Sequence, residues 1–316
     1  MLNNGRMETR RLRILLELSR LGSMRAVADE MGITTSTVSQ QVAALAREAG
    51  AALIEPDGRR VRLTPAGRRL AEHSVTILAA IEAARLDLDP GAEPAGTVRV
   101  SGFATAVRRS LLPIVADLRE RDSKVRVAIH EHEPFEQFAL LAADDIDLAL
   151  TYDYNLAPAT FDATLVARPL WSAPWALGVP AELPRRLRRT AKDEEPLRRL
   201  GRTATGGKIT DFGGHDWIVN SRNTADEHVL RTLASIAGIT PNVVHRADSL
   251  NLVQDLIAAG LGVGMLPADQ PVRAGVRLVP LSDPPVLLRA YAVTRRGRAG
   301  WPPLALVLRL LDTGAR

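Results

Sequence analysis

The chain of 316 residues contains no cysteine. This absence excludes disulfide bonds, thiolate zinc sites and a cysteine nucleophile. The sequence also lacks an uncharged apolar run of about 20 residues, the length that a helix needs to cross a bilayer. The first residues continue into an amphipathic helix, unlike a secretory signal. We therefore expect a cytoplasmic protein that does not contact a membrane.

Motifs of common enzyme chemistry are missing as well. The sequence has no Walker-type phosphate loop and no Gly-x-Ser-x-Gly nucleophile elbow. The glycines of segment 260–264 have a spacing similar to a dinucleotide-binding fingerprint. However, they follow a predicted helix and lead into a strand, the reverse of the order that pyrophosphate binding needs. Segment 130–133 alternates histidine and glutamate, so a strand would place both imidazoles on one face and both carboxylates on the other. With no further ligand evident, we expect no metal, no cofactor and no catalytic site.

The remaining composition is that of a folded protein, with 46% hydrophobic and 24% charged residues. A chain of this length usually forms two or three globular units. Residues 1–70 contain 12 basic and 7 acidic residues, so they account for the whole net charge of +5. Because the N-terminal unit is basic and the rest of the chain is neutral, we expect that only the N-terminal unit binds a polyanion. A genome rich in arginine codons would give the same composition, and composition alone does not separate the two explanations.

Three helical segments are predicted within the first 50 residues. Leu12 and Leu16 belong to the apolar stripe of the first segment. Ser23 is a suitable N-cap for the second, and Gly32 supplies the tight turn of a helix-turn-helix motif. The third helix is predicted to begin after Thr34 and to end near residue 47.

The third helix has one apolar and one polar face. Val38, Val42 and Leu45 follow helical spacing and would pack inward. Glutamine can pair bidentately with adenine, and serine or threonine can contact base edges or phosphates, so the polar face fits the major groove. A solvated surface is the alternative, but such a face usually carries the better helix formers glutamate and lysine. We therefore predict DNA contacts from Thr34, Thr35, Ser36, Thr37, Ser39, Gln40 and Gln41.

A basic hairpin is predicted after the third helix. Asp57-Gly58 lies between two short extended runs, which is a signal for a tight β-hairpin. Arg59, Arg60 and Arg62 on this hairpin would form a wing able to contact the phosphate backbone or the minor groove.

Segments 21–28, 37–45 and 62–67 together resemble the N-terminal signature of the LysR-type transcription regulators. The resemblance covers all of residues 7–64 and implies a winged helix-turn-helix DNA-binding domain. It also implies that Ser23 and Arg25, at the start of the second helix, contact DNA.

Residues 65–90 are predicted to form a linker helix, begun by Thr64 as N-cap and Pro65 at the first position. Alternating steps of four and three residues form an imperfect heptad seam. Such a seam can pair the helices of two subunits. The alternative is an amphipathic helix that packs on its own domain. The resemblance favours a dimer, and a dimer would contact two-fold-related half-sites in DNA. The predicted seam consists of Leu70, Ser74, Ile77, Ile81, Ala84 and Leu88.

From residue 96 onward, predicted strands and helices alternate, which is typical of an α/β fold with a parallel sheet. We expect two lobes joined by crossing strands, with residues 96–169 and 268–316 in lobe I and 170–267 in lobe II. Segment 184–208 is expected to be an irregular surface insertion.

Small molecules bind in clefts between such lobes, near the carboxyl ends of the strands. Polar residues at the strand ends are therefore candidates for ligand binding, although each of them, taken singly, could instead be a turn or helix-cap residue. The predicted effector-binding residues are Ser101, Phe103, Thr105, Tyr152, Asn220, Ser221, Arg222, Asp248 and Ser249.

Segments 147–150 and 253–267 resemble the LysR effector domain, which implies the two-lobed (type 2) periplasmic-binding-protein fold. The resemblance also implies an inducer near Thr105, Asn220 and Ser221. We thus expect a transcription regulator that binds double-stranded DNA and a small-molecule effector as a homodimer or homotetramer, and RNA polymerase if it is an activator. The alternative is a cytoplasmic binding protein or enzyme that uses the cleft, with the N-terminal unit as an interaction module.

Overall fold

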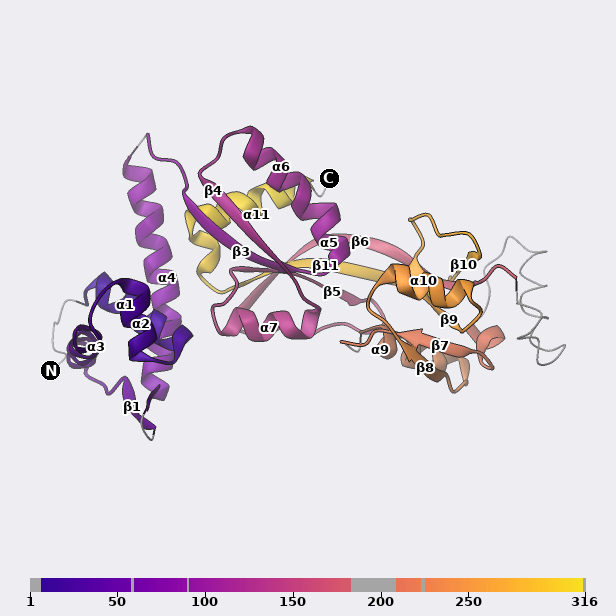
Figure 1. The fold of residues 1–316 in the computed structure, drawn as a ribbon, viewed down its shortest axis with the longest axis horizontal. Coiled ribbons are helices and arrows are strands. Elements are labelled where there is room, and N and C mark those ends of the chain that lie inside the picture. The colour runs from indigo at the N-terminus through magenta and orange to yellow at the C-terminus, as the bar shows by residue number, and fades with distance from the viewer. Residues whose placement is uncertain (1–6, 58–59, 90, 183–208, 223–224, 315–316) are drawn as a thin grey trace.

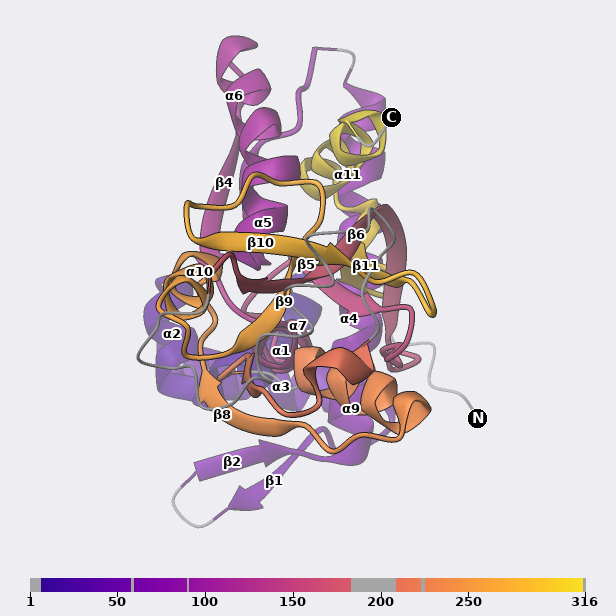
Figure 2. The ribbon, with the colours of Figure 1, turned by 90° about the vertical axis from the view of Figure 1, so that its right-hand side faces the viewer.

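The computed structural model describes residues 7–57, 60–89, 91–182, 209–222 and 225–314. The N-terminal head consists of three helices and a hairpin, which lie at one end of the molecule (Figure 1). The antiparallel hairpin pairs Asp57 with Arg60 and projects beyond the helices (Figure 2). Its elements are α1 (Thr9–Leu21), α2 (Met24–Met31), α3 (Thr35–Ala49), β1 (Ile54–Asp57) and β2 (Arg60–Leu63).

The predicted helix boundaries in the head are confirmed by their caps. The Ser23 side chain accepts a hydrogen bond from the backbone N–H of Ala26 at 3.4 Å, and Thr34 accepts one from Thr37 at 3.1 Å. Gly32, which ends α2, has φ +63° and allows the turn into α3. The inward-facing residues of α3 are buried in a core that also includes α1 and α2.

Helix α4 (Pro65–Leu88) begins with the predicted cap, as Thr64 accepts a hydrogen bond from the N–H of Gly67 at 3.0 Å. It packs on α1 and on the body. Ser74, placed in the intersubunit seam by its spacing, is fully buried within the subunit instead. Leu70 and Ile81 are half-buried, with Leu70 packed against the core of the head. Ile77, Ala84 and Leu88 form an open stripe, in which Ile77 is 38% and Leu88 84% exposed.

The body is built on one sheet, in which the described residues contribute nine strands in the order β4-β3-β5-β11-β6-β9-β7-β8, with β10 added against β6. The strands are β3 (Gly96–Gly102), β4 (Val125–Glu131), β5 (Leu148–Tyr154), β6 (Leu165–Pro180), β7 (Asp216–Val219), β8 (Asn242–Arg246), β9 (Val263–Pro267), β10 (Val276–Pro280) and β11 (Val286–Arg295). The helical elements are α5 (Ala104–Ala106), the π-turn η1 (Val107–Leu111), α6 (Leu112–Glu120), α7 (Pro134–Ala142), η3 (Ile209–Phe212), α9 (Ala225–Ala237), α10 (Leu250–Ala258), η4 (Arg298–Gly300) and α11 (Pro302–Gly314).

The sheet is mixed rather than parallel throughout. β3 pairs in parallel with β4 and β5, and β7 pairs in parallel with β8 and β9, as the alternating pattern predicts. The long strands β6 and β11 run antiparallel to each other and pass from one lobe to the other. Lobe I, with β3–β5, lies beside α4, and lobe II, with β7–β10, lies at the far end (Figure 1).

The boundary of lobe II differs from the expected residue 267. Strand β10 pairs with residues 176–180 of β6, the part of β6 that also pairs with β9. Residues 268–280 therefore pack in lobe II, and the chain returns to lobe I only along β11. Among the described residues, no helix is both long and apolar enough to cross a membrane. The insertion expected at 184–208 lies outside the described residues.

The head contacts the body through α4. Gly297, in the turn after β11, has φ +83°, and a Cβ atom at this position would overlap the side chain of Thr76 in α4. Nearby, the buried carboxylate of Asp147 accepts bonds from Arg99 at 3.0 and 3.1 Å and from Arg298 at 2.7 and 3.1 Å. Burial by itself raises the pKa of Asp147, but the bonds from Arg99 and the charge of Arg298 lower it below its usual range. Asp147 thereby joins β3 to η4, which contacts α4.

Candidate effector cleft and DNA-binding surface

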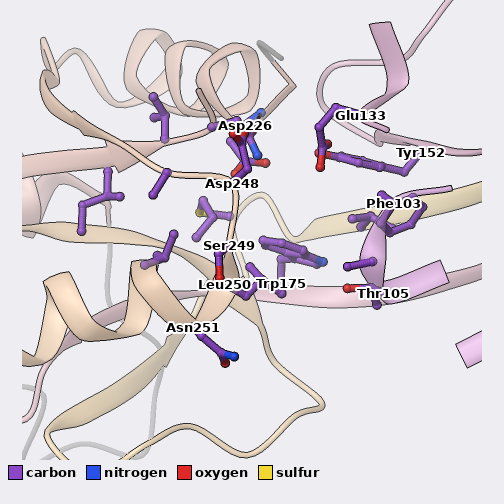
Figure 3. A pocket seen from close by; sticks show the side chains of 18 of the residues that line it. Phe103, Thr105, Glu133, Tyr152, Trp175, Asp226, Asp248, Ser249, Leu250 and Asn251 are labelled. Carbon is purple, nitrogen blue, oxygen red and sulfur yellow. Dashed lines mark hydrogen bonds between the residues drawn. The ribbon is translucent and has the colours of Figure 1, made fainter. Parts of the chain in front are cut away.

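A cavity of ≈ 340 Å³ lies between the two lobes (Figure 3). Figure 3 shows Phe103, Thr105, Glu133 and Tyr152 of lobe I facing Asp226, Asp248 and Ser249 of lobe II. Its volume is at the small end of the roughly 300–1,000 Å³ range of ligand pockets. A cavity of this size fits a metabolite. The other lining residues are Ala104, Arg108, Glu131, Trp175, Ile218, Val219, Asn220, Ala247, Leu250, Asn251, Val253, Met265 and Leu288.

The structure brings six of the nine predicted effector-binding residues to this cavity. They come from the ends of β3, β5, β7 and β8, which meet at the cleft because both lobes direct the carboxyl ends of their parallel strands toward it. Ser249 is also the N-cap of α10, where it accepts a bond from the N–H of Leu252 at 3.5 Å. The six residues are Phe103, Thr105, Tyr152, Asn220, Asp248 and Ser249.

The other three predicted residues do not line the cavity. Ser101 is buried in β3, with its hydroxyl 3.0 Å from Nδ1 of His132. The backbone N–H groups of Ser221 and Arg222 donate to Oδ1 of Asp248 at 2.9 and 3.1 Å. Ser221 and Arg222 therefore hold the Asp248 carboxylate in place at the edge of the cleft.

Several lining residues are absent from the sequence-derived set. Glu131 and Glu133 line the cavity, and the alternation of segment 130–133 already places both on one face of β4 and its extension. Asp226 is near the start of α9, where no sequence motif marks it. Trp175 lines the cavity from β6, a strand that crosses between the lobes.

Two tyrosine hydroxyls donate to carboxylates of the cleft. Tyr152 donates to Oε2 of Glu133 at 3.2 Å, and Tyr154 donates to Oδ1 of Asp226 at 2.7 Å. Burial is the main cause that raises the pKa of Asp226 to about 7; the bond from Tyr154 opposes it, and the charges of Glu133 and Asp248 add to it. Burial also raises the pKa of Tyr154 well above its usual value, so this tyrosine stays a neutral donor. Within the described ranges, no group of three or more histidine, aspartate or glutamate side chains is placed to hold a metal ion.

The polar face of α3 is open to solvent. Its exposed residues lie opposite Val38, Val42 and Leu45, which are buried. Thr34 also acts as a cap by accepting from the N–H of Thr37, and its hydroxyl lies 2.8 Å from those of Ser36 and Thr37. The exposed members are Thr34, Thr35, Ser36, Ser39 and Gln40 on or beside α3, and Arg25 on α2, whereas Ser23, Thr37 and Gln41 are half-buried.

Two predicted DNA contacts are engaged within the subunit. Gln41 accepts a hydrogen bond from Nε of Arg11 at 3.0 Å, and Arg11 also pairs with Glu48. On the wing, the exposed Arg62 pairs with Glu55 at 3.1 Å. Arg59 lies outside the described residues, and only the backbone of Arg60, in β2, is described.

A winged helix-turn-helix head, a linker helix and a two-lobed body with a cleft define a ligand-responsive DNA-binding regulator. The family described as LysR substrate binding domain matches residues 91–316, and the bacterial regulatory helix-turn-helix family of LysR type matches residues 9–68. The chain belongs to the LysR family of DNA-binding transcriptional regulators with an effector-binding domain.

Individual relatives agree with this assignment. The chain is 25% identical over 263 residues to the transcriptional dual regulator GltC of Bacillus subtilis, covering 83% of this chain and 81% of GltC. The structure of full-length OxyR from Pseudomonas aeruginosa has a TM-score of 0.68 at 19% identity, with 98% of each chain covered. Full-length CbnR complexed with its target DNA has a TM-score of 0.52 at 17% identity, covering 97% of this chain and 99% of CbnR. These relatives are transcription regulators rather than enzymes.

Proposed function

We propose that this protein binds a DNA site of two-fold symmetry as a homodimer, or as a tetramer built by pairing of the bodies. The observation that carries the proposal is the exposed row of hydroxyls on α3, together with the amide of Gln40, opposite its buried face. Ser39 and Gln40 are placed to contact base edges, and Arg25, Thr35 and Ser36 to contact base edges or phosphates. CbnR, whose structure includes its target DNA, has the same fold and supports this use of the head.

The open stripe of α4 supports the dimer. Ile77 and Leu88 are large apolar side chains that the subunit itself leaves partly or mostly exposed. Pairing of this stripe with that of a second subunit would bury them and would fix two heads at a set distance.

The cleft is proposed as the effector site. A ligand held between residues of both lobes binds the closed arrangement more tightly than the open one and shifts the population toward it. Because lobe I contacts α4 through the turn at Gly297, this shift can change the spacing of the two heads on DNA. If the protein is an activator, the rearranged complex would contact RNA polymerase in the cytoplasm.

The test is a selection of genomic DNA fragments with the purified full-length protein, beginning with the region upstream of its own gene. We expect enrichment of a site with interrupted two-fold symmetry at moderate salt. Binding that is equally strong to unrelated fragments of the same length would contradict the proposal. The Gln40→Ala variant serves as the internal control, because it should lose the enriched site and keep non-specific binding.

A further inference from the structure

The wall of the cleft carries an excess of acidic groups. Glu131, Glu133, Asp226 and Asp248 line the cavity, whereas Arg108 is the one basic residue among the described residues of the lining. The backbone N–H groups of Ser221 and Arg222 orient Asp248, and Nε of Arg222 lies 3.4 Å from Asp248, so this carboxylate is partly compensated. A pocket of this charge favours a cation over an anion.

Asp226 is one of the four acidic residues of this wall. Asp226 accepts a hydrogen bond from the hydroxyl of Tyr154. The negative charges of Glu133 and Asp248 repel its carboxylate and so raise its pKa. In the part of the chain that the structure describes, no arginine, lysine or histidine forms an ion pair with Asp226. A positively charged group in the cavity would therefore relieve the repulsion among these carboxylates.

Aromatic rings form the other part of the wall. Phe103 and Tyr152 lie with ring centroids 4.6 Å apart, and Tyr152 and Trp175 each contact Tyr154, at 5.9 and 5.5 Å. Figure 3 shows the rings of Phe103, Tyr152 and Trp175 beside the carboxylates. The negative faces of such rings attract an ammonium or guanidinium group and repel an anion. The rings and the carboxylates thus select the same charge.

A purely structural role does not account for the whole arrangement. The bond of Tyr154 with Asp226 would by itself suit a brace between the lobes, and the bond of Tyr152 with Glu133 a brace within lobe I. A brace needs neither Glu131 and Asp248 at the same cavity nor three aromatic side chains around it.

We propose that the effector carries a positively charged nitrogen, which binds between the carboxylates of Asp226 and Glu133 and the rings of Phe103 and Tyr152. The inference rests on the proposed function in one respect, that the cleft is the effector site. A metabolite-sized amine or guanidine fits the volume of the cavity.

The experiment is isothermal titration of the full-length protein, at about pH 8, with three probes of similar size: 2-phenylethylamine, 2-phenylethanol and 3-phenylpropionate. We expect the amine to bind at least about tenfold more tightly than the alcohol and the carboxylate. Asp226→Asn keeps an acceptor for Tyr154 and should weaken amine binding at least about tenfold. Glu120→Gln, an exposed carboxylate on α6, is the matched control and should leave it unchanged.

Three results would overturn the inference: the carboxylate or the alcohol binding as tightly as the amine, Asp226→Asn binding the amine like the parent, or no amine binding up to about 10 mM. DNA binding without any probe is measured on the same preparations. Selective DNA binding without amine binding refutes only this inference. Amine binding without selective DNA binding refutes only the proposed function.

Discussion

The hydroxyl of Tyr154 in β5 donates a 2.7 Å hydrogen bond to Oδ1 of Asp226 in α9, and so joins lobe I to lobe II beside the cleft. Tyr154 is fully buried, so the loss of Asp226 would leave the Tyr154 hydroxyl without this acceptor where water does not readily reach. The bond therefore makes Asp226, a residue that lines the cleft, contribute to the stability of the body.

Tyr154→Phe should lower the free energy of unfolding by about 1–3 kcal/mol, because the Asp226 carboxyl loses its donor. Urea denaturation of the full-length protein measures this loss. Tyr291→Phe is a matched control: its hydroxyl donates to Asp153 at 3.3 Å, but Asp153 keeps two bonds from Arg289. Equal losses in the two variants would contradict a special role for the Tyr154 bond.

Asp226→Asn should remove a pH dependence of stability. The pKa of Asp226 is raised to about 7 in the folded protein, so the folded state keeps this proton when the unfolded state has lost it. The group therefore lowers the free energy of unfolding as the pH rises from about 4 to about 7, with a slope of at most about 1.4 kcal/mol per pH unit. Tyr154, Glu133 and Asp248 are the titratable groups that face it.

Urea denaturation at a series of pH values tests this dependence. The difference between the parent and Asp226→Asn should develop in that window and stay constant above it, in favour of the variant. Parallel curves for the two proteins would show that the folded state does not hold the proton.

Gln40→Ala should weaken binding to the selected DNA site by about 1–3 kcal/mol, the usual value of a bidentate base contact, with little effect on non-specific binding. Gln41→Ala is the matched control because its amide already accepts a bond from Arg11. Fluorescence anisotropy with specific and scrambled duplexes separates the two variants. Equal losses on both duplexes would contradict base recognition by Gln40.

Ile77→Asp and Leu88→Asp should shift the protein from dimer to monomer in sedimentation velocity, since each places a charge in the open stripe of α4. Leu261→Asp changes an exposed leucine, 40% accessible, between α10 and β9, and should leave the assembly unchanged. A dimer that persists in both α4 variants would mean that the subunits pair elsewhere.

Gly297→Ala should destabilise the protein by more than the cost of its positive φ, which is about 1–2 kcal/mol for a residue with a Cβ. The added Cβ would overlap Thr76 and separate α4 from lobe I. Gly50→Ala isolates the backbone cost, because Gly50 has φ +64° and a Cβ added there would meet no neighbouring atom within 4 Å. If thermal unfolding shows the same loss of stability in both variants, the contact between α4 and the body accommodates the added Cβ atom without further cost.

The sequence by itself determined the head and the order of elements in the body. Caps such as Ser23, Thr34 and Ser249 and apolar spacings such as Val38–Val42 act within one or two helical turns, so their effect is visible in the chain. The strand ends that carry Phe103, Tyr152, Asn220 and Asp248 were predictable for the same reason, together with the rule that ligands bind at carboxyl ends of parallel strands.

Only the tertiary structure decided what surrounds each of these residues. Ser74 is buried within the subunit, where α4 packs on both α1 and the body, and Ser221 and Arg222 bind Asp248 instead of lining the cavity. The bond between Tyr154 and Asp226 spans 72 positions in the chain, and β10 joins lobe II because β6 crosses between the lobes. Long-range pairings of this kind depend on how whole elements pack, and a local pattern carries no information about them.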